Sequence, residues 1–537
     1  MDKDEILFHN CTVRTMDPAN PVTEAVAIRD GRIVFTGGKK RCTDALGRRY
    51  RRVDLKGATL VPGFCDSHIH PLSTIYYDMN VNLHGVRNMD EMRARLLERT
   101  GTYLEGKLII GVNFDEQGMD RPTLPSRTDL DAVSDEIPVA IIKHDGHTVY
   151  LNTRALEAAG ITASTPDPTG GLIARDSSGV PTGALHETAV KLAINHFPAP
   201  KMDDFYNGAR RSFGRMLRHG ITSLGLIIQT GIDGPEGILG ALDIPVLEAM
   251  TGEIPQSLSA YVMTESIASL DELKARPVCS RTDGKRLRVL GLKIISDGTF
   301  GSCTAAMREP FCDFPDRRGF MLNDVERMYA LMKEAHLTGY QIAVHAIGDL
   351  ANRTCIDLYG RLMAEHPLHD RRHRIEHASM LDRDMIADAS KLGLVLCVQP
   401  MFIDSEHHWL GKRFGPGRLP IIYPFRSALD AGMVLAGASD SPVESQNVMA
   451  AIEACVTRCG MVPEESITVE QALAMYTSGA AYALFDEKNR GSITPGKAAD
   501  FVALGADPLK VPAHELHSVP VLMTVVGGTD YRHNQAV

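Results

Sequence analysis

The sequence predicts an α/β protein whose centre is a (β/α)8 barrel of the TIM type, with an inserted subdomain after its first strand and a small β-sandwich domain built from both termini. Three observations carry this prediction. Strand-like and helix-like segments alternate through the middle of the chain, which is typical of a parallel sheet with crossover helices. Both ends hold short apolar runs separated by turn-forming residues. The stretch after the first central strand is far too long for a single crossover.

The two ends of the chain share a pattern of short apolar runs and turn-forming residues. Short apolar runs such as Ile6-Leu7-Phe8 and Ala25-Val26-Ala27-Ile28 alternate with turn formers such as Asp30-Gly31. Near the other end, residues 496–504 and 520–528 have the character of strands and a hairpin end. Because domain termini often lie close together, residues 1–58 and 488–537 are predicted to pair into one β-sandwich.

The barrel is predicted to span residues 59–487, with the inserted subdomain at about residues 75–200. Amphipathic stretches at 325–338 and 350–365 are predicted helices between the later strands. A doubly wound sheet fits the alternation too, but no Gly-x-Gly-x-x-Gly follows the first strand. The candidate barrel strands are residues 59–64, 221–228, 257–263, 289–296, 341–345, 374–377, 395–399 and 433–438.

Composition excludes several classes of partner. The formal net charge of -10 argues against nucleic acid or an anionic membrane as a partner. No apolar run is long enough to span a bilayer, and the acidic N-terminus lacks the features of a signal peptide. The ten cysteines include no Cys-x-x-Cys pair, so neither a disulfide framework nor a thiolate zinc site is indicated. A cytoplasmic location is therefore expected.

Two histidines, His68 and His70, follow the first central strand in Val61-Pro62-Gly63-Phe64-Cys65-Asp66-Ser67-His68-Ile69-His70. Alternate side chains of an extended strand share a face, so both imidazoles are predicted to point the same way. Such a pair makes half of a divalent-metal site. A bare His-x-His also arises by chance, so the interpretation requires further ligands at other strand ends.

Four later strands supply such ligands. In a barrel, catalytic residues sit at the carboxyl ends of the strands. Lys293 lies in the fourth candidate strand, His345 ends the fifth, His377 ends the sixth and Asp440 follows the eighth. Four metal-competent groups on the expected side make simple core histidines an improbable explanation.

These motifs resemble the amidohydrolase superfamily, in particular its amidohydrolase-3 or YtcJ-like branch, which includes N-substituted formamide deformylases. The resemblance covers nearly the whole chain. It rests on the Pro62-Gly63-Phe64-x-Asp66-x-His68-x-His70 motif together with the later strand-end ligands. Details typical of the branch are Asp145-Gly146-His147 followed by Asn152, Thr165-Pro166-Asp167-Pro168 with Gly170-Gly171, Pro181-Thr182-Gly183, Lys293-x-x-x-Asp297-Gly298 and Gln399-Pro400.

The resemblance implies a set of roles for these residues. His68, His70 and Asp440 would bind the more buried metal, and His345 and His377 the more exposed one. Lys293, carboxylated on its ε-amine to N6-carboxylysine, would bridge the two; members with one metal also exist. Zinc suits an imidazole and carboxylate set, and manganese or iron suits it as well. A homodimer is left open by the resemblance.

The implied reaction is hydrolysis of an amide-type carbon–nitrogen bond, linear or cyclic, in a small molecule. A metal-activated hydroxide would attack, with Asp440 as general base and then acid. His147 is predicted to contact the substrate or its oxyanion. Further substrate contacts are predicted at Asp297, Gln399 and Trp409, each with a purely structural role as the alternative.

Two other functions remain open at this point. A deaminase or a carbamate or ester hydrolase fits the same scaffold, because fold and metal set do not fix the bond that is cleaved. A non-catalytic binding protein that keeps the barrel is a remote alternative, since such a descendant is expected to have lost ligands. All six ligand positions are filled in this sequence.

Overall fold

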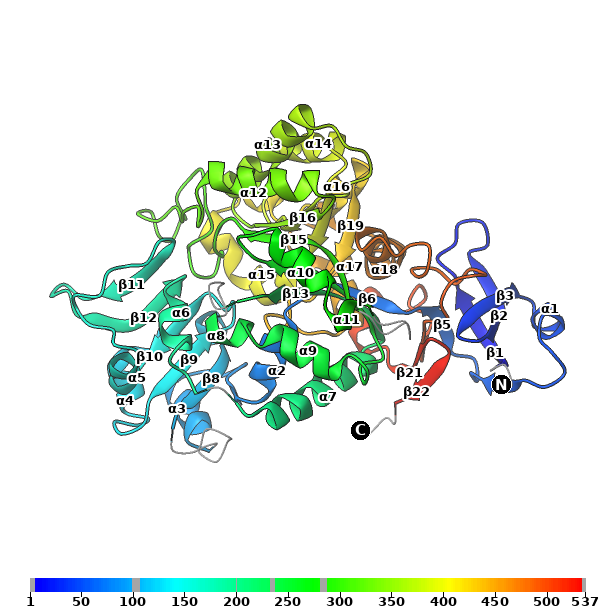
Figure 1. Ribbon diagram of the computed structural model, residues 1–537, viewed down its shortest axis with the longest axis horizontal. Helices are drawn as coiled ribbons and strands as arrows, with labels where there is room; N and C mark the ends of the chain where they lie inside the picture. Colours follow the sequence, from blue (N-terminus) through cyan, green and yellow to red (C-terminus); the bar gives the residue numbers. More distant parts are fainter. Residues whose placement is uncertain (1–4, 99–106, 199, 232–236, 281–286, 534–537) are drawn as a thin grey trace.

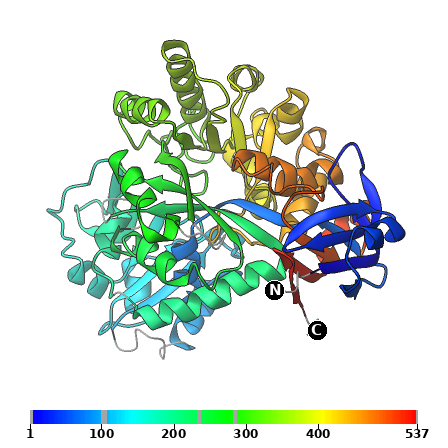
Figure 2. The ribbon, with the colours of Figure 1, turned by 45° about the vertical axis from the view of Figure 1, so that its right-hand side comes forward.

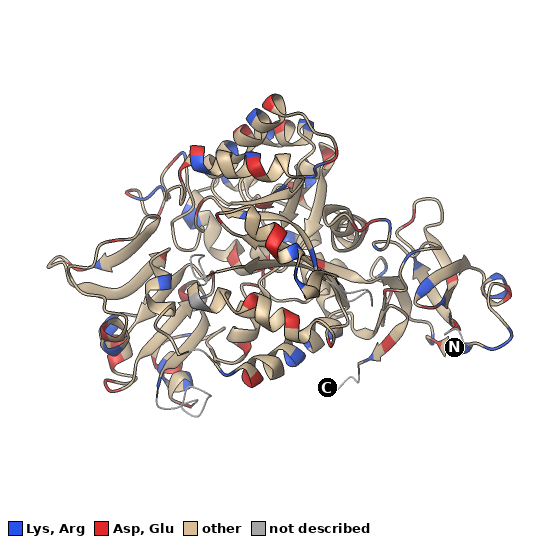
Figure 3. Ribbon diagram, in the orientation of Figure 1, with Lys and Arg blue, Asp and Glu red and all other residues tan. Residues whose placement is uncertain are grey.

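The computed structural model describes residues 5–98, 107–198, 200–231, 237–280 and 287–533. Its strands form three sheets. In Figure 1 the sheet built from the termini lies at the right, the sheet of the insert at the left, and the barrel between them. Lys and Arg are interspersed with Asp and Glu along the ribbon (Figure 3). Within the described ranges, no helix has both the length and the apolar character needed to cross a membrane.

The central sheet is the predicted barrel. Its eight strands are parallel to their neighbours throughout and follow the chain order, with both faces buried as parallel sheets require. Between the first and last strands, Asp440 N–H donates to His68 O at 2.9 Å, so the barrel is nearly closed. The strands are β6 (Phe64–Ile69), β13 (Ile221–Gln229), β14 (Ser257–Met263), β15 (Leu287–Ile295), β16 (Gln341–Ala346), β17 (Arg374–His377), β18 (Val395–Val398) and β19 (Val434–Gly437).

The prediction that residues 59–64 form the first barrel strand is wrong. Residues Thr59–Pro62 form β5 of the terminal sheet, and the barrel begins one residue after the break at Gly63. Gly63 N–H donates to Asp500 O in the terminal sheet, whereas Phe64 N–H donates to Gly220 O beside the barrel. A Cβ on Gly63 would lie 2.3 Å from the Thr222 hydroxyl oxygen, so only glycine fits where the chain changes sheets.

The terminal sheet confirms that both ends of the chain build one β unit. Strand β5 pairs in parallel with β1 and antiparallel with β20, which joins the two ends. The rings of Phe8 and Phe501 meet edge to face in its core, with centroids 5.7 Å apart. Hydrogen bonds connect all its strands into one sheet. The remaining members are β1 (Glu5–Arg14), β2 (Val22–Arg29), β3 (Arg32–Gly37), β4 (Arg51–Asp54), β20 (Phe501–Leu504), β21 (Val521–Val526) and β22 (Thr529–Arg532).

The insert between β6 and β13 has its own mixed sheet, in the order β11-β12-β10-β9-β8-β7. Asn152 fixes its shape, because the buried side chain accepts from two backbone N–H groups and donates to two carbonyls. The elements are β7 (Val81–Asn82), α3 (Met89–Glu98), β8 (Ile109–Phe114), α4 (Arg127–Asp131), β9 (Val139–Lys143), β10 (Thr148–Leu151), α5 (Thr153–Ala158), β11 (Gly171–Arg175), β12 (Pro181–Glu187) and α6 (Val190–Ile194).

Helices surround the barrel, as Figure 2 shows from a second direction. The predicted helices at 325–338 and 350–365 are confirmed as α12 (Val325–Leu337) and α13 (Asp349–Glu365). Asp324 starts α12 by accepting from the Arg327 N–H. Other helices near the barrel are α2 (Pro71–Asp78), α7 (Met202–Arg218), α9 (Asp243–Met250), α10 (Ala268–Lys274), α14 (Arg383–Lys391), α15 (Met401–Phe414), α16 (Phe425–Asp430), α17 (Val448–Thr457) and α18 (Val469–Ala474).

Candidate metal centre

His68, His70 and Asp440 converge where the barrel nearly closes. His68 lies in β6, His70 directly follows this strand, and Asp440 follows β19. Asp440 Oδ1 lies 3.2 Å from His68 Nε2 and 3.4 Å from His70 Nε2. One ligand atom of each residue lies within 4.8 Å of the others, which makes the three a candidate metal site.

The other three predicted ligands join the same cluster. Lys293 of β15 places its Nζ 3.5 Å from His68 Nε2. The rings of His345 and His377, from the ends of β16 and β17, have centroids 4.4 Å apart, and the His377 centroid lies 5.1 Å from that of His68. The fold therefore brings together all six side chains that the strand-end pattern singled out.

A buried ion pair orients His68. Arg374 donates to both oxygens of Glu376 at 2.7 Å, and Glu376 in turn bonds His68 Nδ1. Burial alone would raise the pKa of Glu376, but Arg374 and His68 hold it well below its usual range. With Nδ1 engaged by a carboxylate, His68 is oriented with Nε2 directed at the cluster, the arrangement found in metal-binding histidines.

Glu376 and His68 also converge with Cys397 as a second group of potential ligands. Both Glu376 oxygens are already bonded by Arg374, and burial raises the pKa of the Cys397 thiol well above its usual value. A protonated thiol is a poor ligand. The group around Asp440 is therefore the better candidate.

His345 and His377 are held in the neutral form. Gln399 Oε1 lies 2.8 Å from His377 Nδ1, and Gly298 O lies 3.3 Å from His345 Nε2. Burial lowers the pKa of His377 to about 3 and that of His345 well below its usual value. Neutral imidazole is the form that ligates metals.

The pKa values of Lys293 and Asp440 are both lowered in the cluster, for different reasons. Burial lowers the pKa of Lys293 to about 8, so roughly a tenth of the amine is neutral at pH 7, far more than for an exposed lysine. Burial alone would raise the pKa of Asp440, but His68, His70 and His377 hold it well below its usual range. The neutral imidazoles of His345 and His377, an ionised carboxylate and an amine with a lowered pKa together fit a divalent cation.

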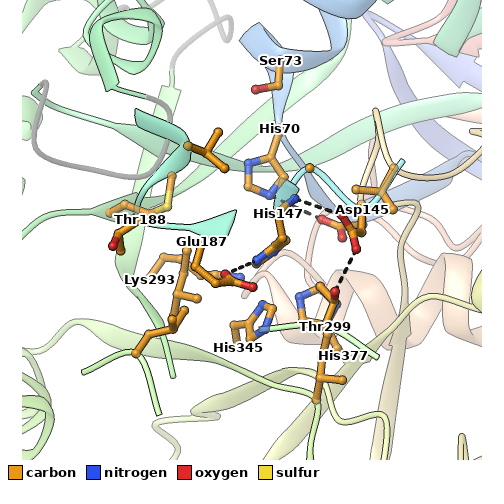
Figure 4. Close-up of a pocket in the computed structure, with 18 of the residues that line it drawn as sticks. His70, Ser73, Asp145, His147, Glu187, Thr188, Lys293, Thr299, His345 and His377 are labelled. Carbon is orange, nitrogen blue, oxygen red and sulfur yellow. Dashed lines mark hydrogen bonds and ion pairs between the residues drawn. The ribbon is translucent and has the colours of Figure 1, made fainter. Parts of the chain in front are cut away.

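The cluster opens into a cavity of about 1140 Å³. Barrel residues His70, Lys293, His345, His377 and Asp440 line one part of it, and the insert supplies another wall (Figure 4). A cavity of this size takes a small organic molecule.

His147 projects from the insert wall toward the cluster (Figure 4). It lies in the turn between β9 and β10, and its ring centroid is 5.8 Å from that of His345. Glu187, at the end of β12, bonds its Nδ1 at 2.6 Å. Burial alone would lower the pKa of His147, but Glu187 and Asp145 raise it to about 9. His147 is thus a cation at neutral pH with its second ring nitrogen unengaged by Glu187.

Asp145 ties this turn to the barrel. Its carboxylate accepts from the His147 N–H at 3.1 Å, from Thr299 Oγ1 at 2.9 Å and from Ser302 Oγ at 2.6 Å. Thr299 and Ser302 belong to the segment that follows β15, the strand that carries Lys293. The position of His147 relative to the cluster is therefore fixed by hydrogen bonds across the two units.

The other predicted substrate contacts occupy different positions. Trp409 lies on α15 and lines the cavity. Gln399 stands behind His377, which it orients. Asp297 is fully buried and accepts from the N–H groups of Ala306, Ile347 and Gly348, so it organises the loops after β15 and β16. Neither Gln399 nor Asp297 belongs to the cavity lining.

Sequence reasoning missed Arg374, Glu376 and Glu187. Glu376 lies directly before His377 in Arg374-Ile375-Glu376-His377, and a charged pair inside a buried strand was a usable signal for a supporting role. Glu187 offered no comparable signal. It reaches His147 only because β12 and β10 are neighbours in the insert sheet.

Comparison with known proteins agrees with this geometry. The model described as Amidohydrolase family, of the amidohydrolase-3 type, matches residues 51–529. The Bacillus subtilis protein YtcJ is 28% identical over 97% of this chain and 98% of its own length. The N-substituted formamide deformylase of Arthrobacter pascens is 27% identical over 98% of this chain and 97% of its own.

One solved structure is similar to this chain in both fold and sequence. It is an uncharacterized metal-dependent hydrolase from Pyrococcus horikoshii OT3, 25% identical, with a TM-score of 0.74. The match covers 95% of this chain and 99% of that one. Because the family model spans most of the sequence and the predicted strand-end ligands meet in one cluster, this chain belongs to the amidohydrolase family.

Proposed function

We propose that this protein hydrolyses an amide-type carbon–nitrogen bond, linear or cyclic, in a small molecule, in a metal-dependent reaction. The observation that carries the proposal is the convergence of six metal-competent side chains in one cluster, five of which line a cavity of small-molecule size. The full-length similarity to a protein named N-substituted formamide deformylase supports an amide-type bond over other bonds.

Residues of this chain are assigned to the metal by their chemistry. His68, His70 and Asp440 would hold one divalent ion, and His345 and His377 a second, with Lys293 as a bridge after carboxylation of its amine. The lowered pKa of Lys293 favours the neutral amine that carboxylation needs. Zinc is the first choice, and manganese or iron fits the same donors. When bound, such an ion supplies Lewis acidity toward the substrate carbonyl and the attacking water.

Proton movement is assigned to two side chains. Asp440, ionised and directed at the cluster, accepts a proton from the attacking water and returns it to the leaving nitrogen. His147, held as a cation by Glu187, donates a hydrogen bond to the oxygen on which negative charge develops. Trp409 contributes apolar contact to the substrate.

The proposal is tested by metal analysis combined with a product screen. The protein as purified is expected to contain divalent metal, and chelation is expected to abolish hydrolysis, with recovery on adding zinc. N-formyl amines, N-acyl amines and cyclic amides are assayed for release of formate, carboxylate and amine. Release of ammonia from amino-substituted heterocycles, or hydrolysis of esters or carbamates only, favours the alternative reactions instead. A protein that neither contains nor responds to metal contradicts the proposal and favours a binding role.

A further inference from the structure

One face of helix α15 forms a part of the cavity that the proposed reaction does not use. Phe402, Ser405, Glu406 and Trp409 recur at helical spacing, and all four line the cavity. The Phe402 ring lies parallel to that of His377 with centroids 6.0 Å apart, so this face begins beside the metal cluster. Glu406 lies one helical turn farther along, roughly 6 Å in axial rise. The face is aromatic at both ends and carries a carboxylate between them.

Glu406 differs from Glu444, the neighbouring carboxylate of the cavity, in the partners that surround it. Glu444 lies 3.3 Å from His144 Nε2 and accepts from Ser405 Oγ at 2.5 Å. Burial alone would lower the pKa of His144, but Glu444 raises it to about 9, so a cation accompanies Glu444. Glu406 accepts a hydrogen bond from the neutral Tyr423 hydroxyl. In the part of the chain that the structure describes, Glu406 has no Lys, Arg or His at ion-pair distance.

The lack of a counter-ion makes the ionised form of Glu406 unfavourable, and a cationic ligand can remove this penalty. A carboxylate in a low-dielectric environment without a counter-ion favours its protonated form. Burial and the charge of Glu444 raise the pKa of Glu406 to about 8, against the effects of Tyr423, His144 and Arg413. Among the charged residues of the cavity lining, acidic side chains outnumber Lys and Arg. A cation beside Glu406 would supply the missing counter-charge, and Trp409, which lines the same face of α15, would contact the apolar part of the ligand.

We propose that this face of α15 is a subsite for an aromatic or apolar group that bears an ammonium, with Glu406 as the residue that selects the positive charge. The inference rests on the proposed amide hydrolysis and narrows its substrate to amides that carry a basic nitrogen. The ammonium would lie about one helical turn from the cluster end of α15, which corresponds to a few bonds from the scissile amide.

Binding of benzylammonium and of its neutral isostere benzyl alcohol to the full-length metal-loaded protein tests the subsite by calorimetry at neutral pH. Benzylammonium is expected to bind at least on the order of tenfold more tightly. Glu406→Gln, which keeps an acceptor for Tyr423, is expected to remove that preference and leave benzyl alcohol unchanged. Asp404→Asn, an exposed carboxylate on the same helix, is the matched control and is expected to change neither affinity.

Proton release provides an independent readout. Below pH 8, binding of a cation requires Glu406 to ionise, so the wild-type protein is expected to release a proton that buffers of different ionisation enthalpy reveal. The Glu406→Gln variant is expected to release none. Trp409→Leu is expected to weaken both ligands, because it removes apolar contact rather than charge.

The outcomes separate this inference from the proposed reaction. Equal affinity for the two probes overturns the subsite, and so does an ammonium preference that survives Glu406→Gln, since the amine would then be held elsewhere, for instance by the metal. Probe binding with the expected Glu406 dependence, in a protein that hydrolyses no amide, leaves the subsite standing and rejects the amide reaction. Hydrolysis of neutral amides without any preference for basic ones rejects the subsite and leaves the amide reaction standing.

Discussion

The barrel wall and the insert wall of the cavity are built in different ways. Barrel residues such as His68 and Asp440 project from the ends of parallel strands, where the backbone is fixed by neighbours on both sides. Insert residues such as His147 and Glu187 lie at turns and strand ends and are positioned by hydrogen bonds to one another. The comparison indicates that the proposed metal chemistry would depend on the barrel, whereas the insert and α15 would determine what binds beside it.

The largest effect is expected from Asp440→Asn. The change preserves shape and a ligand oxygen but removes the base, so turnover is expected to fall about 10³-fold or more while metal content stays nearly intact. Steady-state kinetics and metal analysis of the same preparation measure both. Asp430→Asn, in an exposed ion pair on α16, serves as the control. Undiminished hydrolysis by the Asp440 variant would refute the role.

Glu376→Gln tests whether the barrel side depends on its buried ion pair. Arg374 would remain as a buried cation without its counter-charge, so the free energy of unfolding is expected to fall by about 3–5 kcal/mol. Metal affinity is expected to fall about 10- to 100-fold, because His68 loses its orienting carboxylate. Denaturant unfolding and metal titration measure the two effects. The double variant R374M/E376Q is expected to recover part of the stability; a single variant as stable as wild type contradicts the interpretation.

Glu187→Gln probes the insert side. Without the carboxylate, the pKa of His147 falls from about 9 toward its ordinary value, so the alkaline limb of the rate profile moves to lower pH. Turnover at neutral pH is expected to fall about 10²-fold or less, with metal content unchanged. In the wild type, the same raised pKa stabilises the fold below the unfolded-state pKa and loses that contribution as pH rises through about 9. A pH profile identical to wild type would show that His147 does not act as a cation.

Asn152→Ala is expected to have the smallest effect on the metal centre. The buried side chain bonds the N–H groups of Val139 and Ala155 within the insert, so its loss is expected to lower stability by about 2 kcal/mol. Metal affinity is expected to remain at the wild-type value, because no ligand lies in the insert. A large loss of metal would show that the two walls are not independent.

Much of the barrel and the cluster of candidate ligands was predictable from sequence, because polar residues that end apolar strands of a barrel meet at one face. Lys293, His345, His377 and Asp440 are examples. The first strand was placed a few residues early, because Thr59–Pro62 is as apolar as a barrel strand and only its pairing with β1 and β20 distinguishes it. Glu187 and the α15 face depend on packing between units distant in sequence, which periodicity does not encode.

The break at Pro62-Gly63 has a consequence for the order of synthesis. Strand β5 precedes the barrel in the sequence but pairs with β20, so Thr59 can pair with Leu504 only after the barrel residues have been synthesised. During translation, the edge of β5 that faces β20 therefore has no partner until residues 501–504 have been synthesised. Because an open strand edge can pair with other chains, the β20 segment protects β5 from such contacts as soon as it docks.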